Sequence, residues 1–192
     1  IKTLRPEIKV YGVQSAGAPS MFQSVKEGHR VHLDRVQTIA DGIAVKEPGE
    51  LTFELLNQYV DEIVTVTDEE TAAAILALLE QQKLVAEGAG AVAVAAAMFN
   101  KLPIKGKKVV CLVSGGNVDV TTLSRIVNRG LTKSGRKYSF IIDLDDKPGQ
   151  LSGVCNVVAD QGGNIQSVTH ERVNTAAEIN GCTVRVEMDT RD

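Results

Sequence analysis

The sequence predicts an α/β domain with a parallel sheet over residues 1–130 and a smaller α+β unit over residues 138–192. Up to residue 130, apolar runs of strand length alternate with helical patterns, the order that layered domains with parallel strands produce. The run KKVVCLVS, residues 107–114, is apolar without interruption after its lysines and indicates a strand covered on both faces. After residue 137 the order becomes strand, helix, strand, strand, which begins a ferredoxin-like fold.

The elements of the first domain follow from apolar spacing and from capping residues. Apolar or β-branched runs predict strands at residues 8–13, 62–66 and 107–114. Helical spacing predicts helices at residues 21–29, 51–60, 72–83, 88–99 and 120–130. Thr67 and Glu70 have the spacing of a capping box before the third helix, and Asp119 can cap the last one. Residues 34–45 show little periodicity and predict an ordered loop.

The second unit is separated from the first by residues 131–137, which are mostly polar and predict a flexible linker. Alternating patterns then predict strands at residues 138–146, 164–173 and 182–190. Residues 151–163 form an amphipathic pattern that ends in two glycines, which predicts a helix. We expect a polar loop to join the last two strands as an antiparallel pair.

Composition excludes several classes of function. The 192 residues are 43% hydrophobic and 23% charged, with a net charge of −3 and no basic stripe with interleaved aromatics. Nucleic acid is therefore not an expected partner, and the absence of any long apolar run argues against a membrane partner. Cys111, Cys155 and Cys182 are too far apart for a zinc cluster or a disulfide framework. We expect Cys111 to be a small core residue and the protein to be cytoplasmic.

The loop SGGN, residues 114–117, is the strongest candidate site. It follows the apolar run of residues 107–114, and parallel α/β sheets bind ligands beyond the carboxyl ends of their strands. Its two glycines allow a flat ligand to approach the backbone closely. The loop is not a Walker motif, and the chain contains no GxGxxG fingerprint. On these residues alone, a bare glycine turn is the favoured interpretation.

Two further motifs, IADG at residues 39–42 and EGAGAVAVAAA at residues 87–97, accompany SGGN. In this order and spacing the motifs resemble the fold-type II pyridoxal-phosphate enzymes, three-layer proteins of the tryptophan synthase β type. Within that family the sequence is most similar to threonine ammonia-lyases, with serine racemases next. The stretches DDKPGQL and GGNI resemble part of an ACT domain, a small amino-acid-sensing module. This resemblance implies that residues 138–192 form a partial ACT domain.

The resemblance implies that pyridoxal 5'-phosphate is the cofactor and that Ser114 hydrogen-bonds its pyridine nitrogen. The other cofactor-binding residues that it implies are Gly42, Glu87, Gly115, Gly116 and Asn117. A hydroxyl cannot keep the ring nitrogen protonated as a carboxylate would, so the ring withdraws electrons less strongly. Loss of a β-hydroxyl is then favoured over transamination. For Glu87 an alternative remains, a solvated carboxylate stabilised by a helix start.

Several family features are expected outside this chain. The resemblance places the Schiff-base lysine and a tetraglycine phosphate loop upstream of Ile1, so no catalytic residue is expected here. We expect the chain to be truncated at both ends, a C-terminal fragment that is inactive alone. The parent protein would convert L-threonine to 2-oxobutanoate and ammonia. The alternatives are a serine dehydratase or racemase and a non-catalytic amino-acid-binding regulator.

No strong site for a divalent metal ion is expected, and a weaker site for a monovalent ion is the alternative. At the positions where serine racemases place a Glu and an Asp around a divalent cation, this chain has Gln14 and Ser20. These side chains are uncharged, whereas Mg²⁺ and Ca²⁺ prefer charged oxygens. The histidines show no ligand spacing; they are His29, His32 and His170.

The ACT resemblance also implies an effector site at an interface between two such domains. Its residues are Asp146, Pro148, Gly149, Gln150, Leu151, Asn164 and Ile165. The residues themselves support this site in part, because the free N–H groups at the helix start after Gly149 favour a carboxylate. A plain turn with a helix cap is the alternative. Isoleucine or valine is the expected effector, in a homo-oligomer that is a dimer or a tetramer.

Overall fold

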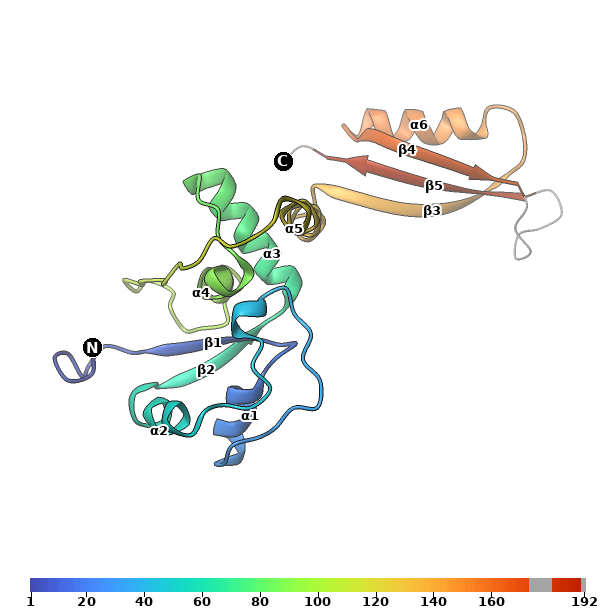
Figure 1. Ribbon diagram of the computed structural model, residues 1–192. Coiled ribbons are helices and arrows are strands. Elements are labelled where there is room, and N and C mark those ends of the chain that lie inside the picture. Colours follow the sequence, from blue (N-terminus) through green and yellow to red (C-terminus); the bar gives the residue numbers. More distant parts are fainter. Residues whose placement is uncertain (173–180, 191–192) are drawn as a thin grey trace. The chain divides into compact units, whose positions relative to one another are not determined.

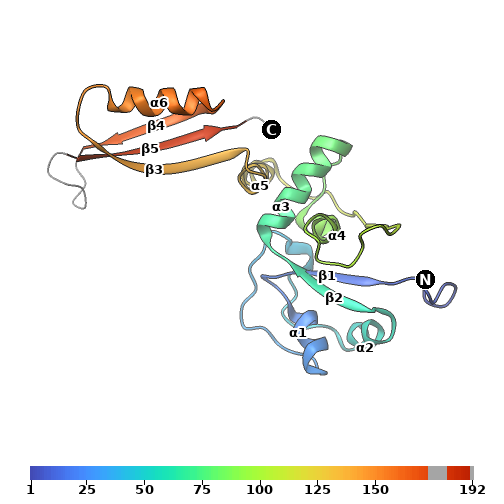
Figure 2. The ribbon, with the colours of Figure 1, turned by 180° about the vertical axis from the view of Figure 1, so that it is seen from behind.

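The computed structural model describes residues 1–172 and 181–190, and the chain divides into two compact units, residues 1–130 and 131–192 (Figures 1 and 2). Among the described residues, no helix combines the length and the apolar character that crossing a bilayer requires.

A parallel pair of strands forms the sheet of the first unit. Strand β1 (Tyr11–Ser15) pairs with β2 (Glu62–Val66), with Tyr11 opposite Glu62 and Ser15 opposite Val66. Helices α1 (Ser20–Glu27) and α2 (Glu50–Tyr59) lie on one side of this pair, and α3 (Asp68–Ala77) and α4 (Gly88–Met98) lie on the other (Figure 1). The α/β class and the parallel strands predicted from the sequence are confirmed.

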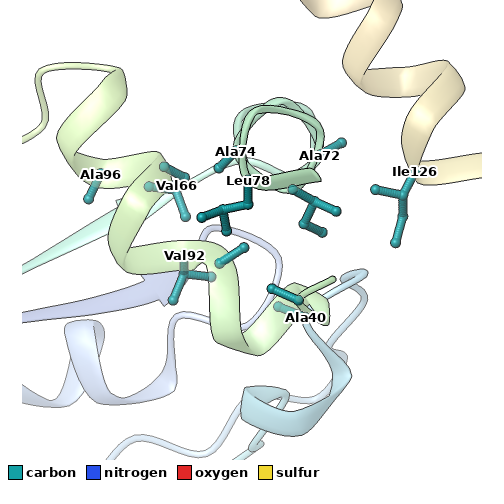
Figure 3. Packing of buried hydrophobic residues seen from close by; sticks show 12 residues of the cluster. Ala40, Val66, Ala72, Ala74, Leu78, Val92, Ala96 and Ile126 are labelled. Atoms are coloured by element: carbon teal, nitrogen blue, oxygen red, sulfur yellow. The ribbon is translucent and has the colours of Figure 1, made fainter. Parts of the chain in front are cut away.

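Small side chains build the core between α3, α4 and the sheet. Val66 of β2, Leu78 after α3 and Val92 of α4 meet there, and Ile126 of α5 (Val120–Lys133) closes the cluster from the far side of α3 (Figure 3). The alanines of the cluster are Ala40, Ala72, Ala74, Ala86, Ala91, Ala95 and Ala96. Because α4 consists of Gly, Ala and Val up to its last residue, Met98, its backbone can pack closely, and six of its eleven residues are buried.

Local sequence signals account for two helix ends, the start of α3 and the end of α1. The Thr67 Oγ1 accepts a hydrogen bond from the Glu70 N–H at 3.2 Å, and the Glu70 carboxylate accepts one from the Thr67 N–H at 2.9 Å, which completes the predicted capping box. Gly28 adopts a left-handed conformation (φ +75°) and ends α1. The helix predicted through Lys83 instead continues from α3 as a π-helical turn, η2 (Leu78–Gln82). The loop predicted at residues 34–45 contains one 3-10 turn, η1 (Asp41–Ile43).

The strand predicted at residues 107–114 is wrong for this structure. The segment has no regular secondary structure, and the side chains of Val110 and Leu112 are 97% and 77% exposed. A strand requires a hydrogen-bonded neighbour, and within the described residues none lies beside it. Cys111 is half-buried rather than a full core residue, and this burial raises the pKa of its thiol.

The second unit is a three-stranded antiparallel sheet with one helix. Strand β3 (Lys137–Asp145) and strand β4 (Asn164–Glu171) flank β5 (Gly181–Asp189), and α6 (Gln150–Asp160) covers one face (Figure 1). The predicted order of strand, helix, strand, strand is confirmed. The polar loop predicted before the last strand falls on residues 173–180, outside the described part of the chain.

The predicted linker is shorter than expected. Helix α5 was predicted to stop at Gly130 but continues to Lys133, and Lys137 already belongs to β3. A helix needs only local hydrogen bonds to extend, so the polar character of these residues did not end it. Residues 134–136 alone connect the two elements.

Asp119 provides a test of how the start of α5 is stabilised. Its carboxylate accepts hydrogen bonds from the Thr122 hydroxyl at 2.6 Å and from the Thr122 N–H at 2.9 Å, and these bonds hold the pKa of Asp119 below its ordinary value. Because the folded-state pKa is lowered, the stabilisation is present above the ordinary Asp pKa of about 3.9 and is lost as the pH falls through the folded-state pKa.

We therefore expect Asp119→Ala to lower the thermal unfolding temperature at neutral pH, with the deficit shrinking toward pH of about 2. Asp119→Asn is the matched control, because asparagine caps helices but does not titrate. Thermal unfolding over this pH range checks the prediction. An Asp119→Ala deficit that is constant with pH would contradict it.

Candidate functional site

The SGGN loop lies against the start of α4. The Glu87 N–H donates to the Gly115 carbonyl at 3.2 Å, and the Asn117 N–H donates to the Glu87 carboxylate at 3.0 Å. The loop is thus held by both the backbone and the side chain of the residue that precedes the helix. Ser114 itself is an exposed residue.

Glycines make this close approach possible. A Cβ added at Gly90 would lie 1.5 Å from the Ser114 carbonyl oxygen, and one at Gly115 would lie 2.4 Å from the Glu87 Cδ. Gly115 also has φ of +73°, which residues with side chains rarely adopt. At Gly88, a Cβ would lie 2.3 Å from the Ile39 carbonyl oxygen. The loops can therefore approach each other this closely because glycines, which have no side chain, stand at these positions.

Gly42 reaches the same place from another loop. A Cβ there would lie 3.1 Å from the Ala89 Cβ and 3.4 Å from the Glu87 Oε1. The predicted cofactor-binding residues are therefore brought together around Glu87; they are Gly42, Glu87, Ser114, Gly115, Gly116 and Asn117.

Sequence reasoning missed the side chains that fix the loop carrying Gly42. The buried Ser15 hydroxyl donates to Thr38 Oγ1 at 2.7 Å, and Thr38 donates to Asp68 Oδ1 at 2.6 Å. The other Asp68 oxygen accepts from the Ile39 N–H at 3.2 Å. These three residues are spread over three elements, so no local motif could have identified the chain of hydrogen bonds.

A cavity of about 390 Å³ lies beside this loop and contains Gly42, Gln14 and Ser20 in its lining. The Gln14 amide oxygen accepts from the Phe22 N–H at 2.8 Å. The Ser20 hydroxyl is buried without a hydrogen-bond partner among the described residues. Both positions offer neutral oxygen atoms, as expected from the sequence.

A second cavity, of about 420 Å³, lies in the second unit between the loop after β3, the start of α6 and the strand ends. The predicted effector residues that line it are Asp146, Pro148, Gly149, Gln150 and Leu151. Asn164 and Ile165 are not among them, because they begin β4 at the opposite end of the sheet, where Asn164 pairs with Asp189.

This cavity carries charges of both signs. Arg172 Nε lies 3.2 Å from Asp146 Oδ2, and Lys147 Nζ lies 2.8 Å from Asp145 Oδ2, a contact that raises the pKa of Lys147. Sequence reasoning missed three lining residues well beyond the loop in sequence: His170 on β4, Arg172 directly after β4, and Cys182 on β5. A ligand with both a carboxylate and an ammonium group would find partners here.

Comparison with known proteins gives consistent results for this chain. The model of the family described as pyridoxal-phosphate dependent enzyme matches residues 1–115. The chain is 50% identical to an L-threonine ammonia-lyase of Thermotoga maritima, over 100% of this chain and 48% of that protein. It is 38% identical to the biosynthetic L-threonine dehydratase IlvA of Bacillus subtilis, over 91% of this chain and 41% of that protein.

Solved structures agree with these relatives. The processed form of threonine deaminase isoform 2 from Solanum lycopersicum superposes with a TM-score of 0.62 at 37% identity, covering 67% of this chain and 38% of that one. Maize serine racemase gives a TM-score of 0.59 at 31% identity, covering 67% of this chain and 42% of that one. The chain spans about half the length of the curated relatives it matches, 48% in the case of the Thermotoga protein.

The close approach at Gly90 gives a direct test of the site geometry. We expect Gly90→Ala to destabilise the protein by about 1–3 kcal/mol, because the added methyl group must displace the Ser114 carbonyl. Gly153→Ala on α6 is the matched control: nothing lies within 4 Å of its Cβ position, so alanine should be neutral or stabilising by up to about 1 kcal/mol. Urea unfolding measures both variants, and equal stability of the two would contradict the described packing.

Proposed function

This chain belongs to the family of pyridoxal-phosphate dependent enzymes, and from this we propose that the whole protein converts L-threonine to 2-oxobutanoate and ammonia. The observation that carries the proposal is the convergence of Ser114 and the glycines at Glu87. The relatives named L-threonine ammonia-lyase support the substrate, since the similarity extends over all of this chain.

The residues around Glu87 fit a flat aromatic cofactor. Gly42, Gly115 and Gly116 expose backbone rather than side chains, and Ser114 is an exposed residue. Pyridoxal phosphate, when bound, supplies an electron-withdrawing ring that stabilises negative charge at the substrate's α-carbon. Ser114 would donate its hydroxyl proton to the unprotonated ring nitrogen, while Glu87 keeps the loop in place through the Asn117 N–H.

The neutral partner at residue 114 favours elimination. A hydroxyl group leaves the ring nitrogen uncharged, so negative charge at the α-carbon is held less strongly than beside a carboxylate. Departure of the β-hydroxyl of threonine would then be favoured over transamination. We expect the 192-residue chain to be inactive by itself, since no lysine in it lies in a family motif.

A serine dehydratase or racemase is the second candidate, supported by the 31% identity to maize serine racemase. A non-catalytic amino-acid-binding regulator is the third, and the retained SGGN loop argues against it. Comparing L-threonine with L-serine as substrates of the full-length protein, with racemisation monitored in parallel, separates these candidates. We propose a cytoplasmic location for the enzyme, with which the free cysteines Cys111, Cys155 and Cys182 are compatible.

For the second unit we propose an amino-acid effector site of the ACT type. The mixed charges of the 420 Å³ cavity suit the two ends of an amino acid: Arg172 and the start of α6 for its carboxylate, and Asp146 for its ammonium group. Asn164 and Ile165 would complete the site from the neighbouring subunit of a dimer or tetramer. Isoleucine or valine is the proposed effector, acting by favouring one arrangement of the oligomer.

Ser114 variants of the full-length protein test the catalytic proposal. Ser114→Ala loses one hydrogen bond, worth about 1 kcal/mol, so kcat/KM for threonine should fall about fivefold. Ser114→Asp should protonate the ring nitrogen, and we expect slower 2-oxobutanoate formation with accumulation of pyridoxamine phosphate.

Ser139→Ala, an exposed position on β3, is the matched control for both variants. Steady-state kinetics and chromatography of the released cofactor provide the readouts. Unchanged rates and no pyridoxamine phosphate in Ser114→Asp would contradict the assigned role.

The effector proposal is tested by calorimetric titration of the full-length protein with isoleucine and valine in the presence of a chelator. Loss of a charged hydrogen bond costs about 1.5–3 kcal/mol, so Arg172→Leu should weaken binding by about tenfold or more. Arg185→Leu, an exposed position on β5, is the control. Absence of binding heat with both amino acids in the unaltered protein would refute the proposal.

A further inference from the structure

Three potential metal ligands converge in the second unit. One ligand atom each of Asp146, His170 and Cys182 lies within 4.8 Å of the others. We propose that this cluster binds a divalent ion of borderline softness, of which Zn²⁺ is the type. The proposal goes beyond the lyase and effector functions and rests on neither of them.

The register of the sheet holds these residues on one face. Cys182 of β5 is opposite Leu144 of β3, and Asp146 follows Leu144 by two residues. On the other side of β5, His170 of β4 is opposite Val184, two residues beyond Cys182. Residues two apart on a strand share a face, so the two cross-strand pairings place the imidazole and the thiol near each other. The positions of His170 and Cys182 therefore follow from strand pairing, and Asp146 lies directly after the end of β3.

The ligand chemistry selects the class of ion. Thiolate and imidazole are ligands that Zn²⁺ prefers, and a carboxylate is an acceptable third. Mg²⁺ and Ca²⁺ require a shell of oxygens and would not use the Cys182 sulfur. Three protein ligands leave one tetrahedral position, and the adjoining cavity of about 420 Å³ has room there for water or a small ligand.

The surroundings allow the site to close around an ion. Cys182 is 2% exposed and provides a fixed sulfur at the base of the cluster. His170 and Asp146 are exposed, so rotation of their side chains can bring the ligand atoms to the spacing of about 3.5 Å that tetrahedral zinc requires. Neither His170 nor Cys182 has a side-chain hydrogen bond to other described residues, whereas Asp146 would exchange its ion pair with Arg172 for the metal.

A bound ion would connect the loop before α6 to two strands. Asp146 lies in the loop that also carries Pro148 and Gly149, while His170 and Cys182 belong to the sheet. Binding should therefore stabilise the second unit, because the ion binds the folded arrangement and not the unfolded chain.

The experiment uses the full chain, stripped with a chelator and kept reduced without added thiols, and titrated with Co²⁺ and Zn²⁺ in the absence of amino acids. We expect one equivalent of Co²⁺ to give visible bands of tetrahedral intensity. X-ray absorption of the zinc form should show one sulfur at about 2.3 Å and nitrogen or oxygen at about 2.0–2.1 Å.

Two variants and two controls make the assignment specific. His170→Ala changes an exposed side chain, so folding should be unaffected, and it should weaken Zn²⁺ binding at least about tenfold. Cys182→Ser retains the size of the buried side chain and should remove the sulfur signal. Cys155→Ser and His29→Ala, outside the cluster, should bind as the unaltered chain does.

A zinc spectrum without sulfur, or equal binding by His170→Ala and His29→Ala, would overturn the proposal. Because the effector titration is performed in chelator and this one without amino acids, failure of either proposal is distinguishable from failure of the other.

Discussion

The hydrogen bond from the Asn117 N–H to the Glu87 carboxylate is the contact on which the candidate site depends. It fixes the SGGN loop against the first turn of α4, where Gly90 leaves room for the Ser114 carbonyl. Gly42 also approaches the Glu87 carboxylate. Three segments distant in sequence thus lie around the Glu87 carboxylate. This carboxylate holds the loop that carries the exposed residue Ser114.

Much of the fold could be predicted because its determinants are local. The capping box of Thr67 and Glu70 and the cap at Asp119 use residues three apart, so the sequence displays them directly. Strand pairing is not local, which is why the apolar run at residues 107–114 indicated a strand that this structure does not form. An apolar run predicts burial but does not identify the neighbour that would provide it.

The residues of the candidate sites also divide into those in local motifs, which could be predicted, and those brought together by distant pairing, which could not. The proposed cofactor residues could be predicted because the short motifs that contain them resemble those of a known family, and the structure brings these motifs together at Glu87. The chain of hydrogen bonds through Ser15, Thr38 and Asp68, and the approach of His170 to Cys182, arise only when distant strands and loops pair. Ligand spacing in the sequence therefore missed a cluster that the sheet register creates.

The most direct test of the account is a crystal structure of the full-length protein with pyridoxal phosphate bound. We predict that Ser114 Oγ lies about 2.8 Å from the pyridine nitrogen, with Gly115 and Gly42 bordering the ring and Glu87 still accepting the hydrogen bond from the Asn117 N–H. A ring bound elsewhere, or one whose nitrogen faces a carboxylate, would contradict it.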